Sequence, residues 1–115
     1  MLERDIETYL VKLCKTLGVH RDKFSSPQKR NVPDNILMYR GAVVFLELKA
    51  PGKKPNEGQQ RDHARRAKAG ACVRWTDSMK GVRVVLVSMS NRRDIPHWDS
   101  IEGDAPYKVN DGTRI

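Results

Sequence analysis

The sequence has few of the residues that stabilise a secreted or a membrane protein. Its 115 residues include two cysteines, Cys14 and Cys72, whose spacing fits neither a disulfide framework nor a zinc site. A reduced, cytoplasmic setting is therefore expected. No apolar run approaches the roughly 20 residues of a membrane span, and the chain opens with an amphipathic pattern in place of a secretory leader. We expect one small domain with a single core.

Acidic residues are scarce relative to basic ones. The chain has 22 Lys and Arg against 14 Asp and Glu, a formal charge of +8. The excess is uneven, because residues 1–89 hold 18 basic and 9 acidic residues, whereas residues 90–115 hold 4 and 5. A basic core suits a phosphate polyanion as partner, although an ordinary basic protein would show the same balance.

Hydrophobic periodicity predicts a single α/β domain with a mixed sheet flanked by helices. Residues 1–89 form the predicted domain, and the polar residues 90–115 form an extension packed on the core or on a second subunit. The predicted helices are 3–17, ending at Gly18, and 57–69, capped by Asn56. The predicted strands are 22–25, 36–39, 43–48, 71–75 and 82–88, the last being a near-continuous apolar run.

The most informative stretch is the predicted hairpin around Arg40-Gly41. With a two-residue loop, counting outward places Asp34 opposite Glu47, where two carboxylates repel each other unless a positive charge lies between them. Lys49 projects from the same face of its strand as Glu47. Carboxylate oxygens suit Mg²⁺ or Mn²⁺. A three-residue loop would shift this register, and a cross-strand salt bridge would explain the charges without a metal.

These motifs resemble the VRR-NUC branch of the PD-(D/E)XK nucleases, over roughly residues 3–88. The matching residues are VPD at 32–34, FLELKAPG at 45–52, Pro55 and Gln59. Two positions depart from the family pattern: Asn31 stands where glycine is usual, and Asn56-Glu57-Gly58 replaces the usual lead-in to the helix. The second departure leaves the choice between Gln59 and Gln60 open.

The resemblance implies a restriction-endonuclease-like core of the αβββαβ type and a metal-dependent DNA endonuclease. It implies Mg²⁺ or Mn²⁺, one ion or two, bound by Asp34, Glu47, the backbone carbonyl of Leu48 and Glu7, with Glu3 as the alternative to Glu7. Lys49 would stabilise developing negative charge or hold the attacking hydroxide. The implied catalytic residues are Asp34, Glu47, Lys49, Gln59 and Glu7.

The expected partner is DNA, in a branched or otherwise structured form, and the expected assembly is a homodimer. The name of the family that the chain resembles suggests a phage origin and action in the host cytoplasm. Two alternatives stay open: a non-catalytic binding module, and a restriction-type enzyme that reads sequence through its last 26 residues. On helix 57–69, the predicted buried face is Gln60, Ala64 and Ala67, while His63 shares a face with Gln59 and is expected to be partly buried or to face phosphate. The predicted phosphate contacts are Lys23, Lys29, Arg30, Lys53, Lys54, Arg61 and Arg65.

Overall fold

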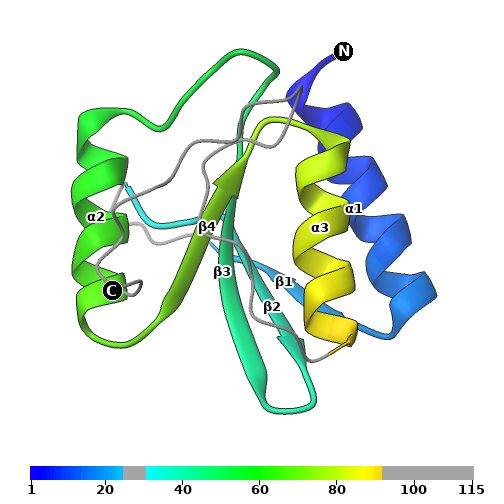
Figure 1. Cartoon of the computed structure of the whole chain (residues 1–115). Coiled ribbons are helices and arrows are strands. Elements are labelled where there is room, and N and C mark those ends of the chain that lie inside the picture. The colour runs from blue at the N-terminus through cyan, green and yellow to red at the C-terminus, as the bar shows by residue number, and fades with distance from the viewer. Residues whose placement is uncertain (25–30, 92–115) are drawn as a thin grey trace.

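A computed structural model describes residues 1–24 and 31–91 of the chain (Figure 1). Within these residues the elements follow the order α1 (Glu3–Leu17), β1 (His20–Lys23), β2 (Asn35–Tyr39), β3 (Ala42–Leu48), α2 (Glu57–Lys68), β4 (Cys72–Thr76) and α3 (Met79–Ser90). In that part of the chain, no helix is long and apolar enough to cross a membrane.

The four strands form one mixed sheet in the order β1-β2-β3-β4. The β1–β2 and β2–β3 pairs are antiparallel, and β4 lies parallel to β3 after the crossover through α2. The α1 and α3 helices lie side by side on one face of this sheet, and α2 lies on the other face (Figure 1). The predicted α/β fold with a mixed sheet is confirmed.

The core lies between the sheet and the α1–α3 pair. Ile6, Leu10 and Cys14 recur at four-residue steps along α1 and are buried against the sheet. The helix ends where Gly18 adopts the left-handed conformation, with φ of 76°. The same core contains Leu37, Val44, Leu46, Leu48, Val82, Val85, Leu86 and Met89.

The hairpin has the predicted two-residue loop. Tyr39 pairs with Ala42, and Arg40 and Gly41 both have positive φ, 46° and 91°. Positive φ at both central residues is the signature of a type I′ turn, whose twist matches that of the flanking strands. The register therefore continues outward as predicted, to Asn35 opposite Leu46. The edge strand β1 lies two residues earlier than the predicted 22–25.

The prediction of a strand at 82–88 is wrong, because these residues belong to α3. Ser78 caps the helix, and its Oγ accepts a hydrogen bond from the Gly81 amide at 3.0 Å. Val82, Val85, Leu86 and Met89 are buried at helical spacing, so one apolar face meets the core. Packing of that face on the core, together with the cap, outweighs the weak β preference of valine.

Helix α2 begins after Asn56 as predicted, but its buried face differs from the prediction. Asp62, His63 and Ala67 are buried, whereas Gln60 and Ala64 are exposed. Polar side chains can occupy this face because Asp62 accepts hydrogen bonds from Arg65 at 3.3 Å and Arg66 at 2.7 Å. Burial of a paired carboxylate is tolerated where burial of an isolated one is not.

Candidate active site

The two predicted acidic residues meet at one end of the sheet. Asp34 immediately precedes β2, and its carbonyl accepts a hydrogen bond from the Phe24 amide at 2.8 Å. Glu47 lies near the end of β3, paired with Trp75 of the parallel strand β4. Because β2 and β3 are antiparallel, the start of β2 and the end of β3 meet at the same end of the sheet. The hairpin thus places both carboxylates together.

Glu47 is a buried carboxylate with incomplete hydrogen bonding. Its Oε2 accepts from Gln59 Nε2 at 3.3 Å and lies 3.7 Å from the Lys49 ammonium. Its Oε1 is buried and has no hydrogen-bond partner among the described residues. The pKa of Glu47 is raised to about 7, chiefly by burial and next by the charge of Asp34, while Lys49 acts in the opposite direction. The carboxyl group is therefore poised to exchange its proton near neutral pH.

Asp34 is the second carboxylate of the site. Burial raises its pKa, while the Lys23 ammonium and the backbone amide of Leu48 lower it. One carboxylate oxygen, Oδ1, accepts a hydrogen bond from Asn35 Nδ2 at 2.9 Å. The charge of Asp34 raises the pKa of Glu47, so the two groups lie within electrostatic range of each other.

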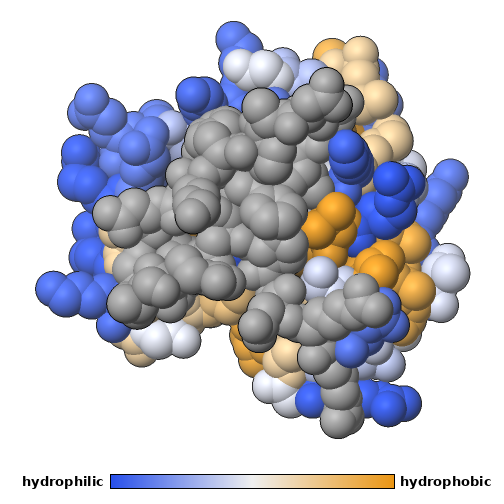
Figure 2. Space-filling model, viewed as in Figure 1, coloured by the Kyte–Doolittle hydropathy of each residue, from blue (hydrophilic) through white to orange (hydrophobic). Residues whose placement is uncertain are grey.

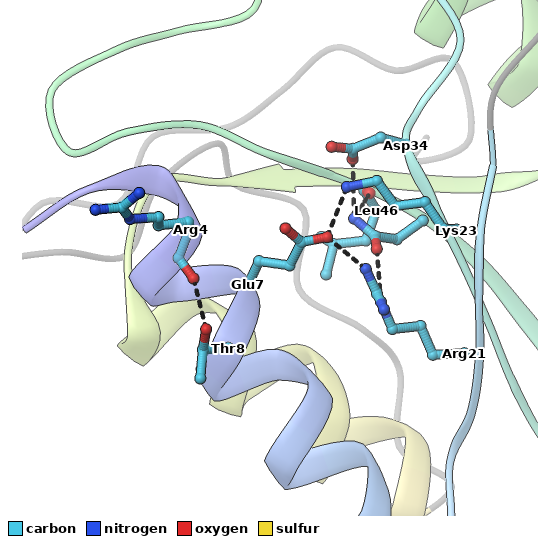
Figure 3. Close-up of polar contacts among 8 residues, drawn as sticks. Arg4, Glu7, Thr8, Arg21, Lys23, Asp34 and Leu46 are labelled. Carbon is cyan, nitrogen blue, oxygen red and sulfur yellow. Dashed lines mark hydrogen bonds and ion pairs between the residues drawn. The ribbon is translucent and has the colours of Figure 1, made fainter.

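Glu7 reaches this region from α1, and its carboxylate is bound by two basic side chains (Figure 3). Its Oε2 accepts from Arg21 Nη2 and from Lys23 Nζ, both at 2.6 Å. The hydrogen bond from Lys23 is the main cause of the lowered pKa of Glu7. Glu3, one turn earlier on α1, is exposed, and its charge raises the pKa of Glu47. Glu3 and Glu7 thus both lie within electrostatic range of the site.

Of the two glutamines considered, Gln59 is the one in contact with the site. Its backbone amide donates to Asn56 Oδ1 at 2.8 Å, and its Oε1 accepts from the Asn56 amide at 2.9 Å. This reciprocal capping box fixes the side chain, leaving Nε2 directed to Glu47. Gln60 instead donates to the carbonyl of Pro55 at 2.8 Å.

His63 lies one turn after Gln59 and is 5 % exposed. Its Nε2 is buried without a hydrogen-bond partner in the described part of the chain. The pKa of His63 is lowered to about 4, chiefly by burial; the Asp62 carboxylate acts in the opposite direction, and Lys49 and Arg66 add to the lowering. The imidazole is thus neutral at physiological pH.

The predicted phosphate contacts differ in their surroundings. Lys53, Lys54, Arg61 and Arg65 are exposed, and hydrophilic side chains cover α2 at the left of Figure 2. Arg65 also bridges to Asp62 at 3.3 Å, and Lys23 is paired with Glu7. Lys29 and Arg30 lie outside the described residues.

The acidic residues at this end of the sheet fit a divalent cation. Glu47 Oε1 is buried without a hydrogen-bond partner among the described residues, and the nearby charge of Asp34 raises the pKa of Glu47. A positive charge between the two carboxylates would relieve their repulsion. Across residues 1–24 and 31–91, no three His, Cys, Asp or Glu side chains are grouped closely enough to hold an ion. Asp34 and Glu47 would therefore need a backbone oxygen, such as that of Leu48, or water to complete the coordination shell.

Comparisons with known proteins agree with this geometry. No family model matches the sequence. A solved structure described as a VRR_NUC domain superposes with a TM-score of 0.68 and 30 % identity, over 74 % of this chain and 94 % of the other. A protein named "Putative nuclease p44", from Acyrthosiphon pisum secondary endosymbiont phage 1, is 42 % identical over 77 residues, covering 66 % of this chain and 83 % of that protein.

The chain belongs to the VRR-NUC family. The family resemblance of the PD and ELK motifs is thereby confirmed, and the domain is a nuclease domain. In this VRR-NUC domain, as in the sequence-based prediction, one end of the sheet brings together Asp34, Glu47, Lys49 and Gln59.

Sequence reasoning missed two polar residues that contact the site from the opposite side of β2. Arg21 and Asn35 occupy inward-facing strand positions, where Asn35 is fully buried and Arg21 Nε donates to its Oδ1 at 2.8 Å. A signal was present, because the hairpin register places Asn35 in phase with Leu37 on the core face. A polar residue in such a position needs a partner, and that partner was hidden by the shifted assignment of β1.

Proposed function

We propose that this VRR-NUC protein is a Mg²⁺- or Mn²⁺-dependent endonuclease that hydrolyses phosphodiester bonds in branched DNA. The observation that carries the proposal is the buried Glu47 carboxylate, with one oxygen unpaired, beside Asp34 and Lys49. A binding module gains nothing from two carboxylates at a phosphate-binding edge, because they repel the DNA backbone. A nuclease needs them to hold a cation there.

Asp34, Glu47 and the carbonyl of Leu48 would hold the ion. Once bound, a divalent cation polarises a phosphoryl oxygen and lowers the pKa of a bound water. Lys49, with 18 % of its side chain exposed, would offer its ammonium to the negative charge that develops on the phosphoryl group. Gln59 would hold the Glu47 carboxylate in one orientation, since its own side chain is fixed by the capping box. Glu7 would join the coordination shell through Oε1 or through water, because Arg21 and Lys23 both bind its Oε2.

The preference for branched DNA and the homodimer are further parts of the proposal. Arginine and lysine contacts to phosphate position a duplex but do not read its sequence. A two-fold symmetric dimer matches the two-fold symmetry of a DNA junction. The phage source of the 42 % identical relative supports a phage origin and action in the host cytoplasm.

The decisive experiment compares cleavage of labelled duplex, flap and four-way-junction DNA with Mg²⁺, with Mn²⁺ and with EDTA. We expect cutting of the branched substrates that EDTA abolishes. Asp34→Asn and Glu47→Gln should abolish cutting and retain DNA binding, whereas Asp22→Asn, which changes an exposed carboxylate of β1, should leave both unchanged. Binding without cutting under every condition would favour the non-catalytic module.

Two further measurements address the remaining parts. Sedimentation of the protein alone and with a junction should show a dimer. The logarithm of the DNA-binding constant should fall linearly with the logarithm of salt concentration, with a slope of about −0.9 for each phosphate neutralised. Equal cleavage of duplex and junction DNA would contradict the proposed selectivity.

A further inference from the structure

Asp34 is connected to α1 by an unbroken chain of hydrogen bonds that crosses two strands (Figure 3). Asn35 Nδ2 donates to Asp34 Oδ1 at 2.9 Å. Asn35 Oδ1 accepts from Arg21 Nε at 2.8 Å. Arg21 Nη2 in turn donates to Glu7 Oε2 at 2.6 Å. Each link is short enough to be a true hydrogen bond.

The chemistry of these groups allows only one orientation of the Asn35 amide. A guanidinium group can donate hydrogen bonds but cannot accept them, so the atom of Asn35 that faces Arg21 must be the oxygen. The NH₂ group must therefore face Asp34, where a carboxylate accepts. The same NH₂ group also donates to the Leu46 carbonyl at 3.2 Å, in the residue before Glu47. A single buried amide thus links the strand that follows Asp34 to the strand that carries Glu47.

We propose that Asn35, oriented by Arg21, is the positioning residue that holds the Asp34 carboxylate toward Glu47. Asn35 is fully buried, so its amide cannot exchange these partners for water. Arg21 is fixed at its far end by Glu7, which also binds Lys23. In this account Glu7 acts through Arg21 on the position of Asp34. The consequence for catalysis rests on the proposed function, whereas the position of Asp34 does not.

The test uses charge-conserving and size-conserving variants. Arg21→Lys keeps the positive charge beside Glu7 but removes the Nε donor. Asn35→Leu keeps the approximate size of the side chain, adds no charge, and removes both the donor to Asp34 and the acceptor for Arg21. The double variant completes a thermodynamic cycle. Leu37→Ala is the matched control, because Leu37 is a buried residue of the same strand that pairs with Arg21 across the sheet but makes none of the hydrogen bonds in the chain.

When Mn²⁺ is titrated into the metal-free protein in a calorimeter, we expect each single variant to bind it at least tenfold more weakly than the wild type, as is usual for residues that orient metal ligands. The double variant should bind Mn²⁺ no more weakly than Asn35→Leu, because Arg21 acts only through Asn35. The turnover number for DNA cleavage should fall with Mn²⁺ affinity, while KM for DNA changes less than about twofold. Equal weakening in Leu37→Ala, or additive effects in the double variant, would overturn the proposal.

A second readout needs neither metal nor activity. In the EDTA-treated protein, the ¹³C resonance of the Asp34 carboxyl group should shift in Arg21→Lys, although Arg21 does not contact Asp34. The shift should vanish when Arg21→Lys is introduced into Asn35→Leu, and Leu37→Ala should not produce it. If the wild-type protein neither binds Mn²⁺ nor cuts DNA, the proposed function fails while this measurement still decides the positioning role. An unchanged resonance in Arg21→Lys would overturn that role.

Discussion

Replacing Glu47 with glutamine should stabilise the metal-free protein at neutral and alkaline pH, although it should abolish cleavage. In the folded state burial raises the pKa of Glu47 to about 7 from an ordinary value of 4.5. Between these values the folded protein retains a proton that the unfolded chain has released. Stability contributed by this group is therefore full below pH 4.5 and is lost as the pH rises to about 7.

The size of this effect follows from the difference in proton affinity. Each tenfold change is equivalent to about 1.4 kcal/mol, so the difference between 4.5 and about 7 amounts to about 3 kcal/mol at pH 8. Glutamine has no charge to bury. Its amide would interact with Lys49 and Gln59 more weakly than the carboxylate does. We therefore expect Glu47→Gln to raise the free energy of unfolding at pH 8 by about 1–3 kcal/mol, the lower figure allowing for imperfect hydrogen bonding of the amide.

His63 produces the opposite dependence and hides the effect in the wild-type protein. Burial lowers its pKa from 6.5 to about 4, so between these values the unfolded chain holds a proton that the folded protein lacks. The stability contributed by neutral His63 is present above pH 6.5 and is lost as the pH falls to about 4. From pH 4.5 to 6.5 the contributions of Glu47 and His63 have opposite slopes and nearly cancel.

The assay is urea denaturation in EDTA from pH 4.5 to 8. Glu47→Gln should show stability rising with pH at up to about 1.4 kcal/mol per pH unit below pH 6.5, and His63→Leu should show stability falling as the pH rises toward 7. Glu57→Gln, in which an exposed carboxylate is changed, serves as the matched control. Addition of Mn²⁺ should stabilise the wild type through linkage and leave Glu47→Gln unchanged. A Glu47→Gln protein no more stable than the wild type at pH 8 would refute the reasoning.

Three further predictions concern the scaffold. Gly81→Ala should destabilise the protein by about 3 kcal/mol or more in urea denaturation, because the new Cβ would lie 1.8 Å from Thr76 Oγ1; an unchanged midpoint would contradict this packing. Arg40→Gly should raise the free energy of unfolding in urea denaturation by about 0.5–1 kcal/mol, since φ of 46° strains a non-glycine residue. Arg66→Gln should cost about 1–3 kcal/mol, as Arg66 stacks on two phenylalanine rings and binds Asp62, whereas exposed Arg65→Gln should stay within about 0.5 kcal/mol of wild type.

Local rules were sufficient to predict the part of the site carried by the hairpin. A two-residue turn at Arg40-Gly41 fixes the register, and the register fixes which residues of β2 and β3 are opposed. Helix α1 and the capping of α2 by Asn56 follow from equally local signals. Asp34 and Glu47 could therefore be paired from the sequence alone.

Features that depend on distant parts of the chain were not predicted. Val82–Ser88 favours a strand by residue preference, but the core accepts its apolar residues only at helical spacing. The buried face of α2 depends on a stack of Arg66, 5.4 Å from the Phe45 ring and 5.9 Å from the Phe24 ring. No spacing rule along the sequence brings those three residues together.

The polar residues around the site differ in a way that bears on function. Asn35 has all its polar atoms in hydrogen bonds, and Arg21 and Glu7 are tied into the same chain. On the α2 side, Glu47 Oε1 and His63 Nε2 are buried without partners in the described residues. A buried unpaired polar atom costs about 1–3 kcal/mol, so a sequence selected for stability alone would replace these groups. Glu47 and His63 lie next to a network in which the Asn35 amide is fully hydrogen-bonded. The unpaired atoms on the α2 side therefore lower stability, and we infer that they are kept because the reaction takes place there.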